Sequence, residues 1–115
     1  MSQRDPVSAL LDMLAYAEEA VALTDGRSRA ALSTDRSFEL ALRKLLEIVG
    51  EAAAQVPPDI RERHPELNWQ QAVAMRNRLI HAYFSVDLDI LWSTANLSLP
   101  AFIAQLRAII EQETA

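Results

Sequence analysis

The chain has 115 residues, half of them hydrophobic and only two of them glycine, so its size and composition predict one folded domain over residues 1–115 and exclude a disordered chain. It has no cysteine, which excludes disulfides and cysteine metal sites, and its two histidines are too few for an all-histidine metal site. The net charge of −5 argues against a broad basic face that coats nucleic acid, so contact with RNA or DNA is expected only at a local site.

The N-terminal segment gives no sign of export or membrane insertion. MSQRDPVSAL has no long apolar run after its arginine, so we expect no signal peptide. No stretch of the chain approaches the ~20 apolar residues that a membrane-spanning helix needs. These features predict a soluble, cytoplasmic protein without a membrane partner.

The first predicted helix starts at Asp5, an N-cap that is followed by Pro6 at the first helical position. Thr24-Asp25-Gly26 is typical of a helix end. The next segment, RSRAALSTDRS (27–37), is polar and small. We interpret it as a loop, with a new N-cap near residues 33–34.

The second predicted helix has a long apolar stripe at helical spacing. It ends before Pro57, because the residue before a proline avoids the helical region. Gly50 inside this helix costs about 1 kcal/mol relative to alanine, and close approach of a neighbouring helix is the expected compensation.

The second half predicts further helices and no strand. Residues 59–63 form a short turn, and a long helix covers residues 67–84. Asp87 is expected to cap the next helix, Pro100 to bend or break it, and residues 102–110 to form the last amphipathic segment. The prediction is an all-α fold, an antiparallel bundle of four or five helices.

The stretch RNRLIHAYF (76–84) places several polar side chains on an otherwise apolar helix. At about 100° per residue, Arg76 falls near the middle of the face that carries Trp69, Ala72, Val73, Leu79, Ile80 and Tyr83. A guanidinium there needs an anionic partner or an open cleft. Asn77 and His81 lie on one edge of this face, with His81 roughly 140° around the helix from Arg76. A second copy of the helix across a twofold axis could bring both groups to one site.

These side-chain types suit the cleavage of RNA without a metal. Histidine can accept and donate protons near neutral pH, and arginine can bind a phosphate through two hydrogen bonds. Asparagine can orient the substrate or the imidazole. Together they fit attack of a 2′-OH on the neighbouring phosphate.

A structural interpretation is equally open at this stage. Arg76 could pair with a carboxylate such as Glu47 or Glu51, and His81 could be a helix cap or a surface residue. Arg78, on the opposite face, is expected to be solvated, and His64 is expected in a surface loop. Trp69 and Trp92 are expected in the core and not as platforms for stacking bases.

Several sequence motifs resemble one known family. RNRLIHAY is similar to the R-x4-H-x-Y motif of HepT-like proteins in the HEPN superfamily. LLEIVGEAA (45–53) resembles the second-helix signature of that family, and HPELNWQQAVAMRNRLIHAYFSVDLDILW (64–92) follows the family almost throughout. The resemblance covers most of the chain.

This resemblance implies a HEPN helical bundle that forms a homodimer, with the motifs of both subunits lining a shared cleft. It implies a metal-independent RNase that is the toxin of a toxin–antitoxin pair, with RNA as substrate and no cofactor or DNA partner. Arg76 and His81 would be the catalytic pair, supported by Asn77. An MntA-type nucleotidyltransferase antitoxin would neutralise the toxin by transferring AMP from ATP to Tyr83. The alternative is a non-catalytic helical dimer that binds a nucleotide or serves as a partner module of a nucleotidyltransferase.

Overall fold

The computed structural model describes residues 5–115, and of Tyr83 it describes only the backbone. Over this part of the chain every regular element is a helix, which confirms the predicted all-α bundle. The four long helices are α1 (Ser8–Thr24), α3 (Arg36–Gln55), α5 (Trp69–His81) and α7 (Leu99–Thr114). The shorter elements are α2 (Arg29–Thr34), α4 (Pro58–Arg63), η1 (Tyr83–Ser85), α6 (Leu88–Ser93) and η2 (Thr94–Ser98).

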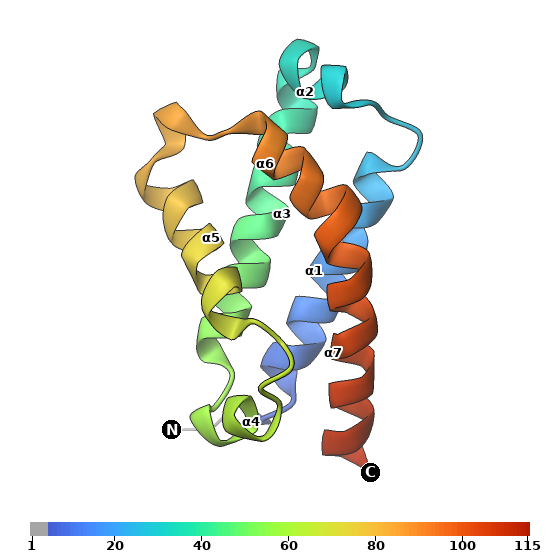
Figure 1. Cartoon of the computed structure of the whole chain (residues 1–115), viewed down its shortest axis with the longest axis vertical. Coiled ribbons are helices and arrows are strands. Elements are labelled where there is room, and N and C mark those ends of the chain that lie inside the picture. Colours follow the sequence, from blue (N-terminus) through green and yellow to red (C-terminus); the bar gives the residue numbers. More distant parts are fainter. Residues whose placement is uncertain (1–4) are drawn as a thin grey trace.

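The long helices alternate in direction (Figure 1), and their packing forms a chain of neighbours: α5 lies on α3, α3 on α1, and α1 on α7. The core lies along these contacts, and Leu10, Met13, Leu42 and Leu106 are fully buried in it. Within the described residues, no helix is both long enough and apolar enough to span a membrane. Since α5 has its main contact with α3 alone, its remaining faces are open to form sites.

The first helix begins slightly later than predicted. The Asp5 carboxylate accepts a hydrogen bond from the N–H of Val7 (2.9 Å), and regular α-helix starts at Ser8. The predicted end is confirmed, because Gly26 follows α1 with φ of 75°, a left-handed conformation that glycine adopts without steric cost.

The predicted loop at residues 27–37 is wrong, because it contains the short helix α2. Two tertiary contacts hold it: Leu32 is buried, and the Nε of Arg29 lies 2.6 Å from a carboxylate oxygen of Asp89 on α6. The N-cap of α3 is Asp35, one residue past the predicted position, and its side chain accepts from the N–H of Phe38. Isolated helices this short are not stable, so the sequence pattern alone does not reveal α2.

The long helix predicted over residues 67–84 is shorter at both ends. Asn68 caps α5 by accepting from the N–H of Gln71, and the helix ends at His81 before the 3-10 turn η1. Ile80, which the projection placed among core residues, is 38% exposed, so that part of the prediction is wrong. Of the tryptophans, Trp69 is buried as expected, and Trp92 is half-buried against the core.

Gly50 lies where α3 and α5 come closest. A Cβ atom at this position would lie 2.4 Å from the Cβ of Arg76 and 2.5 Å from the carbonyl oxygen of Ala72. The expected reason for a glycine inside this helix is therefore confirmed: only glycine lets the two backbones approach this closely.

Of the predicted bend or break at Pro100, the break is not found, so that part of the prediction is wrong. Residues 88–114 stay helical throughout, and the turn just before the proline is π-helical. There the N–H of Leu99 donates to the carbonyl of Thr94, five residues back. Pro100 falls within the first turn of α7, where a missing N–H is best tolerated.

His64 is buried, so its predicted place in a surface loop is wrong. Its Nε2 lies 2.6 Å from a carboxylate oxygen of Glu113 and its Nδ1 lies 3.5 Å from Glu66. Arg63 contacts both carboxylate oxygens of Glu113, and this hydrogen bonding, with a smaller contribution from His64, lowers the pKa of Glu113 to about 2. We call Arg63, His64 and Glu113 the C-terminal clamp, because they tie the end of α7 to the end of α4.

Candidate active site

The Arg76 side chain lies between α5 and α3 and is paired with a carboxylate. Its Nη1 donates to the Glu51 carboxylate over 2.8 Å, and the two side chains are 22% and 50% exposed. Of the two partners considered from the sequence, Glu51 is therefore the one found, since Glu47 pairs with Lys44. The Nε of Arg76 is buried and makes no hydrogen bond within the described chain. The guanidinium thus keeps unused donors although one nitrogen is engaged.

His81 is the last residue of α5, and it is exposed. Its imidazole makes no hydrogen bond or ion pair with the described residues, and the same holds for the exposed amide of Asn77 one turn earlier. Arg76 is held toward α3 while His81 is exposed to solvent, and no hydrogen bond joins them within one chain. This agrees with the roughly 140° separation expected from helix geometry.

The backbone of Tyr83 opens η1, directly after α5. The hypothesis that its hydroxyl accepts AMP concerns a side chain outside the described part of the structure. Its neighbour Phe84 is 91% exposed and shares a shallow pocket of about 400 Å³ with Leu40 of α3, which is 45% exposed. We call these two residues and the exposed Ile80, near the end of α5, the apolar patch; charged side chains of α3 also line the pocket. Exposed apolar groups that gather in this way commonly mark a contact surface.

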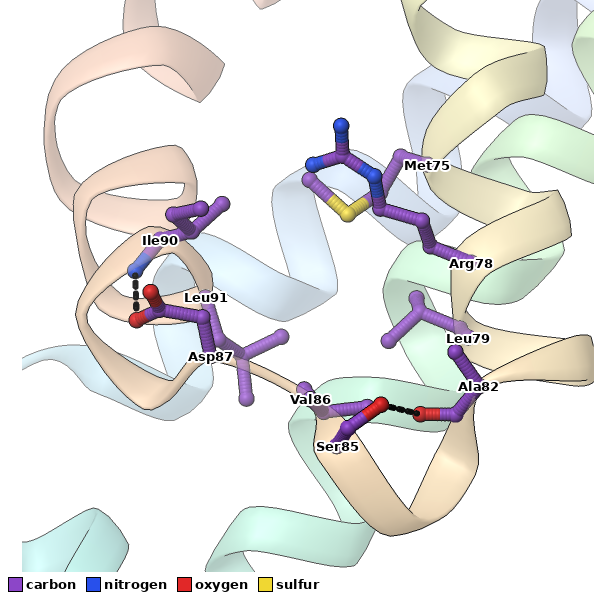
Figure 2. Close-up of a pocket in the computed structure, with 9 residues that line it drawn as sticks. All are labelled: Met75, Arg78, Leu79, Ala82, Ser85, Val86, Asp87, Ile90 and Leu91. Carbon is purple, nitrogen blue, oxygen red and sulfur yellow. Dashed lines mark hydrogen bonds between the residues drawn. The ribbon is translucent and has the colours of Figure 1, made fainter.

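A second pocket, which the sequence pattern did not predict, lies between α5 and α6. It has a volume of about 310 Å³ and is lined mainly by apolar side chains, with Arg78 among them (Figure 2). Arg78 is exposed as predicted, but it faces this pocket and not only open solvent. The pocket depends on the turn at residues 82–87, which places α6 opposite the C-terminal half of α5, and helical periodicity carries no information about that turn.

The described residues include no group of three or more histidine, aspartate or glutamate side chains that could hold a metal ion. The chemical groups gathered near the end of α5 are instead a guanidinium, an amide and an imidazole. These groups can bind a phosphate and transfer protons.

Comparison with known proteins decides the family. The family model described as "Ribonuclease HepT-like" matches residues 13–109, which includes all of α5 and most of α1 and α7. The chain belongs to this family. It is thus a member of a family of ribonucleases, and the fold and the family resemblance expected from the sequence are both confirmed.

Individual relatives agree with this family. The chain is 32% identical to "Putative RNase MJ0125" of Methanocaldococcus jannaschii over 111 residues, which cover 96% of both chains. It is 42% identical to "Probable ribonuclease HepT" of Thermococcus cleftensis over 67 residues, 58% of this chain and 61% of the relative. No solved structure matches the chain.

Proposed function

We propose that this HepT-like chain, folded as one domain, is the RNase toxin of a toxin–antitoxin pair and cleaves RNA without a metal in a cleft between two copies. The observation that carries this proposal is the exposed imidazole of His81, which has no partner among the described residues and lies on the same helix as Arg76, in a member of a ribonuclease family. An imidazole without a partner is free to exchange protons with a substrate, and a guanidinium with unused donors can bind a phosphate.

In the proposed reaction one His81 takes the proton of an RNA 2′-OH, and the 2′-oxygen attacks the neighbouring phosphorus. The bond from phosphorus to the 5′-oxygen breaks, and the His81 of the second copy donates a proton to that oxygen. The products are a 2′,3′-cyclic phosphate and a 5′-OH. Arg76 stabilises the charge that grows on the phosphate oxygens, and Asn77 orients the substrate.

Dimerisation would solve the geometric problem posed by one chain. Arg76 and His81 do not converge within a single α5, whereas a twofold axis beside this helix can bring the Arg76 of one copy toward the His81 of the other. The apolar patch supports such an interface, because Phe84, Leu40 and Ile80 expose apolar surface around the end of α5.

Neutralisation would act through Tyr83. In the proposed reaction its hydroxyl oxygen attacks the α-phosphorus of ATP, held by an MntA-type nucleotidyltransferase, and pyrophosphate leaves. The attached AMP adds bulk and negative charge two residues after His81, where the RNA backbone must bind, and like charges repel.

The test is single-turnover cleavage of RNA by the wild type and by His81→Ala. We expect the rate to fall by roughly 10²–10⁴-fold, the usual contribution of a general acid–base group, with an unchanged melting temperature. The matched control is Arg107→Gln, which removes an exposed arginine of α7 that pairs with Glu18. Tyr83→Phe should cleave RNA normally and resist neutralisation by the nucleotidyltransferase with ATP.

A second candidate function is a non-catalytic partner module of a nucleotidyltransferase, and the ion pair between Arg76 and Glu51 favours it because that pair gives the arginine a structural role. In that case the purified wild type would leave every RNA uncut, and His81→Ala would leave growth unchanged. Tyr83→Phe would still prevent AMP transfer.

A further inference from the structure

The pocket in Figure 2 lies between the C-terminal half of α5 and α6, and the residues proposed for catalysis do not line it. Its walls are mainly apolar and include Met75, Leu79, Ala82, Val86, Ile90 and Leu91. Its volume of about 310 Å³ lies at the lower end of the ~300–1,000 Å³ typical of small-ligand sites. The pocket is therefore large enough for one planar organic group, not for an extended ligand.

Among the described residues that line this pocket, Arg78 is the only basic one, and Figure 2 shows its guanidinium extended over the pocket beside Met75. It forms no ion pair with the described residues, whereas Arg29, Arg63 and Arg76 all do. An exposed guanidinium at the edge of an apolar pocket is complementary to a ligand that has both an apolar part and an anionic part.

Two carboxylates lie at or near the pocket: Asp87 lines it, and Asp89 follows two residues later on α6. Asp87 caps α6 by accepting from the N–H groups of Asp89 and Ile90, at 2.8 and 3.2 Å. Asp89 pairs with Arg29 of α2. Neither acid forms an ion pair with Arg78 within the described residues, so the donors of its guanidinium are available to an anion from outside the chain.

The position of Arg78 relative to His81 relates this pocket to the proposed reaction. The two residues are three positions apart on α5, and such side chains are neighbours, with about 5–6 Å between Cβ atoms. A phosphate at Arg78 would therefore lie beside the phosphate at which His81 acts. A polynucleotide, which has one phosphate and one base in each nucleotide, fits this spacing better than an isolated small molecule.

We propose that the pocket between α5 and α6 is a subsite for the base of the RNA nucleotide next to the cleaved bond, and that Arg78 binds the phosphate of that nucleotide. This inference rests on the proposed function, because the base and phosphate contacts belong to the RNA that the proposed reaction cleaves. The apolar walls contact the faces of the base, which every base offers, so the subsite favours single-stranded RNA and is tolerant of sequence. Binding through Arg78 weakens as salt rises.

The experiment uses the full-length protein and short single-stranded RNA oligonucleotides in which one nucleotide beside the cleaved bond is abasic. Ala82→Leu fills the pocket, Arg78→Gln removes the cation, and Arg107→Gln is the matched control. In the wild type we expect the abasic position to lower kcat/KM by about tenfold, which is in the range measured for the loss of one stacked base. In Ala82→Leu, whose pocket is already filled, the abasic position should change kcat/KM little. Arg78→Gln should raise KM with kcat nearly unchanged, and Arg107→Gln should change neither.

Three outcomes would overturn the inference. The abasic position could lower kcat/KM equally in the wild type and in Ala82→Leu, or Arg78→Gln could behave like Arg107→Gln. Ala82→Leu could also cleave RNA normally and lose binding of the nucleotidyltransferase, which would make the pocket a protein-docking site. Circular dichroism and thermal melts show whether each variant is folded, and Ser85→Leu, at an exposed residue of the same pocket, fills it from the other side if Ala82→Leu does not fold.

Failure of the proposed function gives a different result. If the wild type cuts no RNA, binding of the same oligonucleotides can still be measured by fluorescence anisotropy. Weaker binding in Arg78→Gln, together with loss of the abasic effect in Ala82→Leu, would then support the subsite without catalysis. Equal binding by all variants would reject it.

Discussion

The two histidines of this chain lie in opposite environments. His64 is 4% exposed, and both of its ring nitrogens face carboxylates, whereas His81 is exposed and has no partner among the described residues. A buried polar side chain must be satisfied because an unpaired one costs stability. His64 is thus engaged in holding the fold together, and His81 is available for chemistry.

The same contrast separates two regions of the molecule. The C-terminal clamp joins segments about fifty residues apart in the sequence, and its ion pairs hold the end of α7 in place. The end of α5 instead leaves an imidazole, an amide and an apolar patch exposed. Residue type alone does not distinguish these roles, whereas burial and the number of hydrogen-bond partners do.

The largest effect on stability is expected from His64→Ala. This change leaves a cavity at a buried position and removes one partner of Glu113, so we expect a loss of about 2–4 kcal/mol in the free energy of unfolding. Denaturant unfolding measures it. The matched control is His81→Ala, an exposed position where the change should stay within about 0.5 kcal/mol. Equal losses at the two positions would remove the distinction drawn between the histidines.

A smaller loss is expected from Gly50→Ala, which changes the packing of the helix that carries the proposed site. The new methyl group would overlap the Cβ of Arg76 and the carbonyl of Ala72, so α5 must move away from α3, at a cost of about 1–3 kcal/mol. The control is Gly26→Asn, because nothing lies within 4 Å of a Cβ at Gly26 and asparagine tolerates its left-handed backbone. A melting temperature for Gly50→Ala equal to that of the control would mean that the two helices separate freely.

Local sequence patterns predicted much of this fold. Pro57 placed the end of α3, Asp87 placed the start of α6, and Gly50 indicated the close contact between α3 and α5. Each of these features depends on backbone chemistry within a few residues. The all-α class follows from the same local preferences.

The errors arose where distant segments decide the outcome. His64 is buried because Glu113 of α7 reaches it, and α2 persists because Leu32 joins the core. The pocket beside Arg78 is formed by residues of α5, of α6 and of the turn between them. The motif itself predicted Arg76, Asn77 and His81 as candidates, but no pattern within one chain indicates which face of α5 a second copy would cover.

A modest effect is expected from Glu51→Gln at the proposed site. The pair with Arg76 is partly exposed, so its loss should change stability by less than about 1 kcal/mol. The freed guanidinium should bind RNA phosphate better and lower KM by roughly two- to fivefold, which corresponds to a free-energy change of that size. A loss of several kcal/mol in thermal or denaturant unfolding, with KM unchanged, would instead indicate that Arg76 acts mainly in holding α3 and α5 together.

The smallest expected effect is on the stability of the fold at acid pH, and it concerns the C-terminal clamp. Arg63 and His64 lower the pKa of Glu113 from its usual 4.5 to about 2, so the folded state binds this proton more weakly than the unfolded state does. The stability that the clamp contributes is therefore fully present above about pH 4.5 and is lost as the pH falls toward about 2. Melting curves between pH 6 and pH 2 should fall less steeply for Glu113→Gln than for the wild type in that window.

Glu51→Gln is the matched control for this acid transition, because it removes a carboxylate of α3 that lies outside the clamp. Its melting temperature should follow the wild-type slope between pH 4.5 and pH 2. If Glu113→Gln also kept the wild-type slope, the acid sensitivity would belong to other carboxylates. Asp35 would then be the first to test, because hydrogen bonds from the Phe38 backbone and from Arg27 lower the pKa of that carboxyl too.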